Sequence, residues 1–141
     1  MEKKNVLFFK TANDHVFGNM LAHYAQLDAN KYCLIQASAL ARYSRMHQDI
    51  TFISLGVESY YDVADSVIQQ VAVRAYDTIY IPTTAPQAIG FDNVIQLVRH
   101  LQYERLVFFH SPSDRHEVKR MSAAEEARVR EEIREIEQSL A

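Results

Sequence analysis

The sequence predicts a three-layer α/β sandwich built around a mostly parallel β-sheet. Short apolar segments rich in β-branched and aromatic residues alternate with longer segments whose apolar residues repeat at helical spacing, and this alternation is typical of strand–helix–strand units. The clearest strand covers residues 78–81, which have helical patterns on both sides and are followed by Pro82. A strand flanked by helices is usually an inner strand of a parallel sheet. The length of 141 residues predicts a single α/β domain over residues 1–141.

Four strands are predicted from continuous apolar runs at residues 5–9, 51–55, 78–81 and 105–109. Helices are predicted between them by the spacing of apolar residues, from Asn13 or Asp14 to about 27, from 59 to 71, and from 92 to 101. Ser59 with Asp62 resembles a capping box, and Asp92 is a suitable helix cap. Right-handed crossovers between such units give a Rossmann- or flavodoxin-like topology.

Residues 31–48 fit two interpretations. Tyr32–Ile35 can form a further strand followed by a short helix from Ala37 to His47, or the whole segment can be one helix capped by Asn30. Periodicity does not separate the two for a short apolar run. We favour the helix, because the segment contains many good helix formers and few β-branched residues. The choice decides between four and five parallel strands.

A charged amphipathic helix is predicted near the C-terminus, over about residues 123–140. A capping box at Ser122 and Glu125 starts it. Its narrow apolar seam, surrounded by Arg and Glu, consists of Val129, Ile133, Ile136 and Leu140. We favour docking of this seam on the sheet. The alternative is a homodimer contact between two such helices, because the spacing also fits a coiled coil.

Composition excludes several classes of function. The net charge of −3 gives no electrostatic footprint for duplex DNA or RNA. Three glycines are too few and too dispersed for a P-loop or a dinucleotide-binding loop. No apolar run approaches the roughly 18 residues that span a bilayer, and the four apolar residues at 6–9 are too few for a signal peptide, so we expect a cytoplasmic protein without a membrane partner. Cys33, the single cysteine, is expected to be a buried and unreactive thiol.

Polar side chains follow each predicted strand, and the carboxyl ends of parallel strands meet at one edge of a sheet. Ligands bind at that edge near the point where strand order reverses, which we expect beside the loops after residues 5–9 and 78–81. The candidate acid, base or nucleophilic groups are Asp14, His15, Glu58 and His110. The candidate ligand-binding groups are Lys10, Asn13, Thr83, Thr84, Ser111, Asp114 and Arg115.

These residue types favour binding of a small polar or anionic ligand similar to a nucleotide or a sugar phosphate. Lys10 and Arg115 supply positive charge in place of a glycine-rich loop. Transfer or hydrolysis requires an acid and a base whose environments separate their pKa values. No histidine pair has the spacing of a metal site, and the sequence identifies no cofactor. The alternative function is a non-catalytic interaction or regulatory module that dimerises or docks through the C-terminal helix.

Residues 42–47 interleave arginines with a tyrosine. Such a pattern can stack on and neutralise single-stranded nucleic acid. The negative net charge favours instead a solvated helix face.

Overall fold

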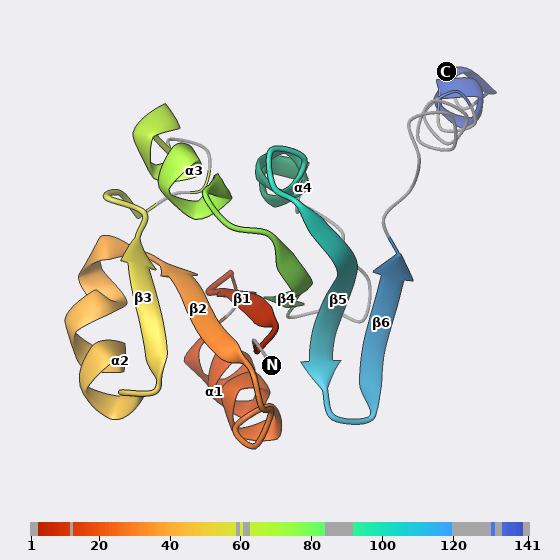
Figure 1. Cartoon of the computed structure of the whole chain (residues 1–141). Coiled ribbons are helices and arrows are strands. Elements are labelled where there is room, and N and C mark those ends of the chain that lie inside the picture. Colours follow the sequence, from red (N-terminus) through yellow and green to blue (C-terminus); the bar gives the residue numbers. More distant parts are fainter. Residues whose placement is uncertain are drawn as a thin grey trace.

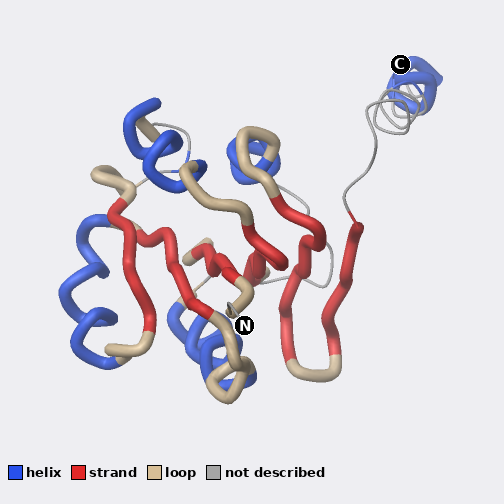
Figure 2. The backbone as a smooth tube through the Cα atoms, in the orientation of Figure 1, coloured by secondary structure: helices blue, strands red, loops and turns tan. Residues whose placement is uncertain are grey.

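A single six-stranded sheet forms the centre of the molecule (Figures 1 and 2). The structure is a computed structural model that describes residues 3–11, 13–58, 60, 63–83, 92–119, 131 and 134–139. The strands are β1 (Asn5–Phe9), β2 (Asn30–Ile35), β3 (Ile50–Ser54), β4 (Tyr76–Pro82), β5 (Tyr103–Ser111) and β6 (Asp114–Lys119). Their order is β3-β2-β1-β4-β5-β6. The first five are parallel, and β6 is antiparallel to β5.

Helices cover both faces of the sheet, which confirms the layered α/β architecture. One face packs against α1 (Asp14–His23) and α2 (Leu40–Met46), the latter preceded by the 3₁₀ turn η1 (Ala37–Ala39). The other face packs against α3 (Asp65–Ala72) and α4 (Asp92–Val98). Figure 1 shows these two pairs of helices on opposite sides of the strands. No helix within the described ranges has the length and apolar character needed to cross a bilayer.

Strand β1 contributes to both hydrophobic cores. Val6 and Phe8 belong to the core under α1 and α2, whereas Leu7 and Phe9 belong to the core under α3 and α4. All four side chains are buried, and the strand pairs with β2 on one edge and with β4 on the other. The continuous apolar run that predicted this strand therefore reflects burial on both faces.

The helix that we favoured for residues 31–48 is wrong, and the strand interpretation holds. Residues 30–35 form β2 between β1 and β3, and only residues 40–46 form an α-helix. Cys33, Leu34 and Ile35 are fully buried, because the two faces of this inner strand meet the two cores. Tertiary burial here outweighs the weak helix propensity of the segment. Cys33 is a buried free thiol, as predicted.

The loop predicted after residue 109 is also wrong. Residues 110 and 111 complete β5, a tight turn follows, and residues 114–119 form β6, so the sheet has six strands instead of four or five. The sequence of β6 gave no strand signal because an antiparallel edge strand buries only one face, and here Val118 packs against the core beside α4.

Helix boundaries differ from the predictions at several places. Helix α1 ends at His23 with Tyr24 as its cap, four residues before the predicted end. Helix α3 begins at Asp65 after an extended Ala64, so the predicted start near Ser59 is wrong, although Ser59 and Asp62 themselves lie outside the described residues. Of the predicted C-terminal helix, residues 131 and 134–139 are described, and they are helical.

Truncating Phe17 tests the core beneath α1. Phe17 is fully buried and its ring meets that of Tyr43 edge-on at 5.0 Å between centroids. We expect Phe17→Ala to lower the free energy of unfolding by about 3–5 kcal/mol, because it removes a buried ring and leaves a cavity. Urea denaturation followed by circular dichroism measures the difference.

The matched control is Val73→Ala, because the Val73 side chain is 72% exposed. This change should alter the free energy of unfolding by less than about 0.5 kcal/mol. Equal effects of the two substitutions would contradict the placement of α1 on the sheet.

Candidate functional site

The strand order reverses between β1 and β4, as we expected. From β1 the chain continues to β2 on one side, and from β4 it continues to β5 on the other. In open α/β sheets this reversal leaves a crevice at the carboxyl ends of the two strands, where ligands bind. The loop after β1 is held from both sides, since Thr11 Oγ1 donates to Pro82 O (2.7 Å) and Gln36 Nε2 donates to Lys10 O (2.9 Å).

Two cations and a tyrosine converge on the Asp14 carboxylate in the first turn of α1. Asp14 Oδ1 lies 3.3 Å from Lys10 Nζ and 3.0 Å from Arg42 Nη2, and it accepts a hydrogen bond from Tyr43 Oη at 2.5 Å. We call these four residues the Asp14 cluster. The Lys10 side chain is only 12% exposed. The cluster carries two positive charges and one negative charge, so its net charge is positive.

The Asp14 cluster fixes the charge state of its carboxylate. The hydrogen bond from Tyr43, together with Lys10 and Arg42, lowers the pKa of Asp14 despite some opposing desolvation. Burial, reinforced by the Asp14 carboxylate, raises the pKa of Tyr43 to about 12. Asp14 is therefore ionised and Tyr43 is protonated at neutral pH. A carboxylate with a lowered pKa is suited to positioning cations and is a weak proton acceptor.

Asn13 and His15 flank Asp14 at the start of α1. Asn13 Oδ1 accepts a hydrogen bond from Val16 N at 2.9 Å and so caps the helix, which is one of the two caps that the sequence predicted. His15 is exposed, and its Nε2 lies 3.4 Å from Asn19 Nδ2 one turn further along. The Asn13 side chain thus has a structural role, while the His15 ring remains accessible to a ligand.

His110 and Thr83 lie together at the carboxyl ends of β5 and β4. His110 Nδ1 is 3.0 Å from Thr83 O. Because a carbonyl oxygen can only accept, Nδ1 carries the proton, which leaves Nε2 of the neutral ring as an acceptor. Thr83 is buried, and its N–H donates to Phe109 O at 2.8 Å. Thr84 lies outside the described residues.

Glu58 lies in the turn after β3 and binds η1 rather than α1. Its carboxylate accepts hydrogen bonds from Ser38 N (3.0 Å) and from Ser38 Oγ. These bonds lower the pKa of Glu58. Glu58 is therefore ionised at neutral pH, and its described role is to join the loops after β2 and β3.

The remaining predicted residues lie at the β5–β6 hairpin. Ser111 Oγ is 3.3 Å from Ser113 Oγ within the turn. Asp114 and Arg115 belong to β6, and Arg115 Nη1 donates to His23 Nε2 at 3.3 Å. The structure thus divides the predicted set into the Asp14 cluster with its neighbours, the His110–Thr83 pair, Glu58 with Ser38, and the hairpin residues.

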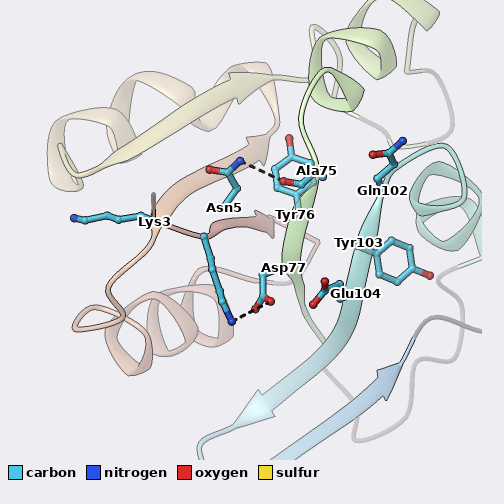
Figure 3. A pocket seen from close by; sticks show the side chains of 9 residues that line it. Lys3, Asn5, Ala75, Tyr76, Asp77, Gln102, Tyr103 and Glu104 are labelled. Atoms are coloured by element: carbon cyan, nitrogen blue, oxygen red, sulfur yellow. Dashed lines mark hydrogen bonds and ion pairs between the residues drawn. The ribbon is translucent and has the colours of Figure 1, made fainter. Parts of the chain in front are cut away.

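A hollow of about 580 Å³ lies at the opposite edge of the sheet, at the amino ends of β1, β4 and β5 (Figure 3). Two pairs of its polar groups contact each other: Lys4 Nζ lies 3.6 Å from Asp77 Oδ1, and Asn5 Nδ2 donates to Ala75 O at 3.2 Å. The other lining residues are Lys3, Tyr76, Gln102, Tyr103 and Glu104. Ligands of parallel sheets bind at the carboxyl edge, so we do not place the functional site in this hollow.

Sequence reasoning missed several residues that complete the carboxyl edge. Arg42 and Tyr43 were assigned to a solvated helix face, yet Tyr43 is buried and both contact Asp14. Gln36 was assigned no role, although its Oε1 is buried and accepts no hydrogen bond from any described residue. Only the placement of residues 31–35 in a strand brings residues 36–43 to this edge. The favoured helix interpretation concealed them.

Comparison with known proteins gives no functional information. Searches against protein-family models, curated proteins and solved structures found no match to this chain. Within the described ranges, no group of three or more His, Cys, Asp or Glu residues is placed to hold a metal ion. The functional inference therefore rests on the fold and on the geometry of the site.

The Tyr43→Phe variant tests the charge state of Asp14. It removes the hydrogen bond that lowers the pKa of Asp14 most, so the pKa measured by NMR titration of the carboxyl should rise. A carboxylate whose folded pKa is lowered stabilises the fold above its unfolded pKa of about 3.9, and this contribution is lost as the pH falls through the folded pKa. The variant should therefore lose about 1 kcal/mol or less at neutral pH, and the loss should shrink in acid.

Tyr24→Phe provides the control, because Tyr24 packs against Tyr80 and has no hydrogen bond to a carboxylate in the described part of the chain. Its effect on the free energy of unfolding should not change over the same acid range. A pH-independent effect of Tyr43→Phe would contradict the role of Tyr43 in holding Asp14 ionised.

Proposed function

We propose that this chain is a binding domain for a small anionic ligand, such as a sugar phosphate or nucleotide, at the carboxyl ends of β1 and β4. The observation that carries the proposal is the convergence of Lys10 and Arg42 on a single carboxylate, Asp14, at the start of α1. The excess positive charge lies at the strand-order reversal, which is the usual ligand position in this class of sheet.

The electrostatics of this edge favour an anion. Lys10 is largely buried between α1 and α2, with Nζ 5.6 Å from the centroid of the Phe17 ring and 5.9 Å from that of Tyr43. A cation held in such surroundings is screened less by solvent than a surface lysine. The first turn of α1 adds the positive end of the helix dipole.

The neighbouring uncharged groups favour a ligand that also carries hydroxyl or amide groups. Gln36 Oε1 is buried without a hydrogen-bond donor among the described residues, and a ligand hydroxyl would satisfy it. His110 Nδ1 donates to Thr83 O, so in the uncharged ring Nε2 is the nitrogen that can accept from a ligand. Asp14 and Glu58 are ionised and occupied by protein donors, so binding is better supported than acid–base catalysis. Transfer or hydrolysis, with His110 as the base, stays a prediction.

Ligand-induced stabilisation tests this proposal. A panel of sugar phosphates and nucleotides is screened by thermal shift with the wild type and with Lys10→Met, which preserves the length and packing of the side chain but removes its charge. A ligand at a hundred times its Kd stabilises the fold by about 2.7 kcal/mol, which raises Tm by several degrees at this size. We expect such a shift in the wild type and its loss in Lys10→Met.

Arg45→Gln is the matched control. Arg45 lies on α2, is exposed, and donates to Ala41 O, its one hydrogen-bond partner among the described residues, so its replacement removes one positive charge outside the Asp14 cluster. The shift should persist in this variant. No shift with any ligand of the panel, or equal shifts in wild type and Lys10→Met, would refute the proposal.

A second candidate function is protein interaction through the C-terminal helix. Ile136, the only seam residue that the structure describes, is 59% exposed, and an exposed large apolar side chain in a helical seam favours a partner. Under this proposal a second copy of the chain covers the seam. Val129, Ile133 and Leu140 lie outside the described residues.

Oligomeric state tests the second candidate. If the seam forms a homodimer, Ile136→Glu should shift the protein from dimer to monomer in sedimentation equilibrium, because the substitution buries a charge in an apolar contact. Glu137→Gln, at a neighbouring position that is also exposed, should leave the dimer intact. A wild-type protein that is monomeric at high concentration would rule out this function.

A further inference from the structure

A second hollow, of about 280 Å³, lies on the face of β4, β5 and β6 that carries α1. Its lining residues are Tyr24, Thr78, Tyr80, Arg105, Val107, Arg115 and Glu117. None of these residues belongs to the Asp14 cluster. The volume is close to the lower end of the range of small-molecule pockets, about 300–1,000 Å³.

The hollow lies where no helix of the described ranges covers the sheet. Strands β5 and β6 are joined by a hairpin turn, so no crossover helix lies over them, and α1 ends at His23. The floor is formed by Thr78, Tyr80 and Val107, which are buried. The rim is formed by longer side chains: Arg105 of β5, Arg115 and Glu117 of β6, and Tyr24, which caps α1.

The rim carries more positive than negative charge. Arg115 donates to His23 Nε2 at 3.3 Å, and no carboxylate within the described ranges lies at ion-pair distance from it. Arg105 faces Glu117 across the strand pair, with 3.9 Å between Nη1 and Oε1, and both side chains are nearly half exposed. An ion pair at this distance and exposure to solvent contributes little binding free energy between Arg105 and Glu117. An arriving anion can therefore bind Arg115 without breaking an existing ion pair, with Arg105 beside it.

The aromatic part of the hollow lies against these arginines. The Tyr24 and Tyr80 rings are 4.2 Å apart between centroids. Tyr24 is half-buried, so part of its ring remains open to a ligand. Burial, followed by the proximity of Tyr24, raises the pKa of Tyr80 to about 12, so its hydroxyl stays protonated at neutral pH. Planar rings stack on such residues irrespective of their detailed hydrogen-bonding pattern.

We propose that this hollow binds a mononucleotide-sized organic phosphate, with the phosphate on Arg115 and Arg105 and the ring against Tyr24. Guanidinium groups match phosphate oxygens in bidentate geometry. A bare phosphate would leave the tyrosine surface unused, and a neutral nucleoside would leave the arginines without an anionic partner. A ligand that carries both a phosphate and a planar ring would use the arginines and the tyrosine surface of the hollow together. This site is separate from the crevice proposed for the Asp14 cluster.

Titration of the ¹⁵N-labelled protein with the 5′-monophosphates of adenosine, guanosine, cytidine and uridine tests the proposal. At least one nucleotide should shift the amide signals of residues 78–80, 105–107 and 115–117. Inorganic phosphate and the matching nucleoside, used as separate probes, should each bind at least about tenfold more weakly than the nucleotide, because each supplies one half of the interaction.

Charge variants locate the phosphate. Arg115→Gln should weaken nucleotide binding by about tenfold or more, which is the range of a charge-assisted hydrogen bond. Glu117→Gln should strengthen it about two- to fivefold, the scale of an exposed charge pair, because it frees Arg105 and removes a negative charge. Arg45→Gln should leave the affinity unchanged. Circular dichroism and Tm establish that each variant is folded.

Three outcomes would overturn the proposal. They are the absence of nucleotide binding at millimolar concentration, equal affinity for nucleotide and inorganic phosphate, and undiminished binding by a folded Arg115→Gln protein. Lys10→Met separates the two sites. Signals at 78–80 and 115–117 should still shift in that variant, whereas any shifts at residues 10–16 that reflect the Asp14 cluster should be lost.

Discussion

The burial of β1 on both faces and along both edges is the constraint on which the rest of the structure depends. Its side chains alternate between two cores, and its backbone pairs with β2 and with β4. Residues 6–9 of this strand are buried and apolar, so the first polar side chain after them in the direction of the carboxyl edge is Lys10. The same position places the reversal of strand order beside that end. The position of β1 therefore determines both the two hydrophobic cores and the location of the Asp14 cluster at its carboxyl end.

The two proposed sites hold their cations in different ways. At the end of β1, Lys10 and Arg42 are fixed by a shared carboxylate, so their positions are set before any ligand arrives. On the β5–β6 face, Arg115 contacts the His23 ring, and no acid among the described residues lies at ion-pair distance to compensate its charge. Preorganised cations favour selective binding at the first site. At the second site an anion can bind Arg115 without first breaking an ion pair.

Whether a strand could be predicted from its sequence depended on which of its residues are buried. Strands β1 and β4 were recognisable because both of their faces are apolar, and their places predicted where the strand order reverses. Strand β2 was one of two interpretations and was not the favoured one, because the burial of Cys33 and Leu34 cannot be seen in a helix-like composition. Strand β6 was missed because its polar side chains lie on a face that no described helix covers. Contacts such as Tyr43 with Asp14, 29 positions apart, depend on strand order and so cannot be read from local pattern.

The sheet also has a consequence for how the chain folds. Strands β1 to β3 form one continuous segment and β4 to β6 form another, and within the described sheet the β1–β4 pairing joins them. Thr11 and Pro82, which are hydrogen-bonded beside this junction, are 71 positions apart. The loop-closure entropy of such a pairing is larger than that of the β5–β6 hairpin, which closes locally and forms in about 1–10 μs. We therefore expect each half to gain structure early. The later pairing of β1 with β4 should then limit the overall folding rate.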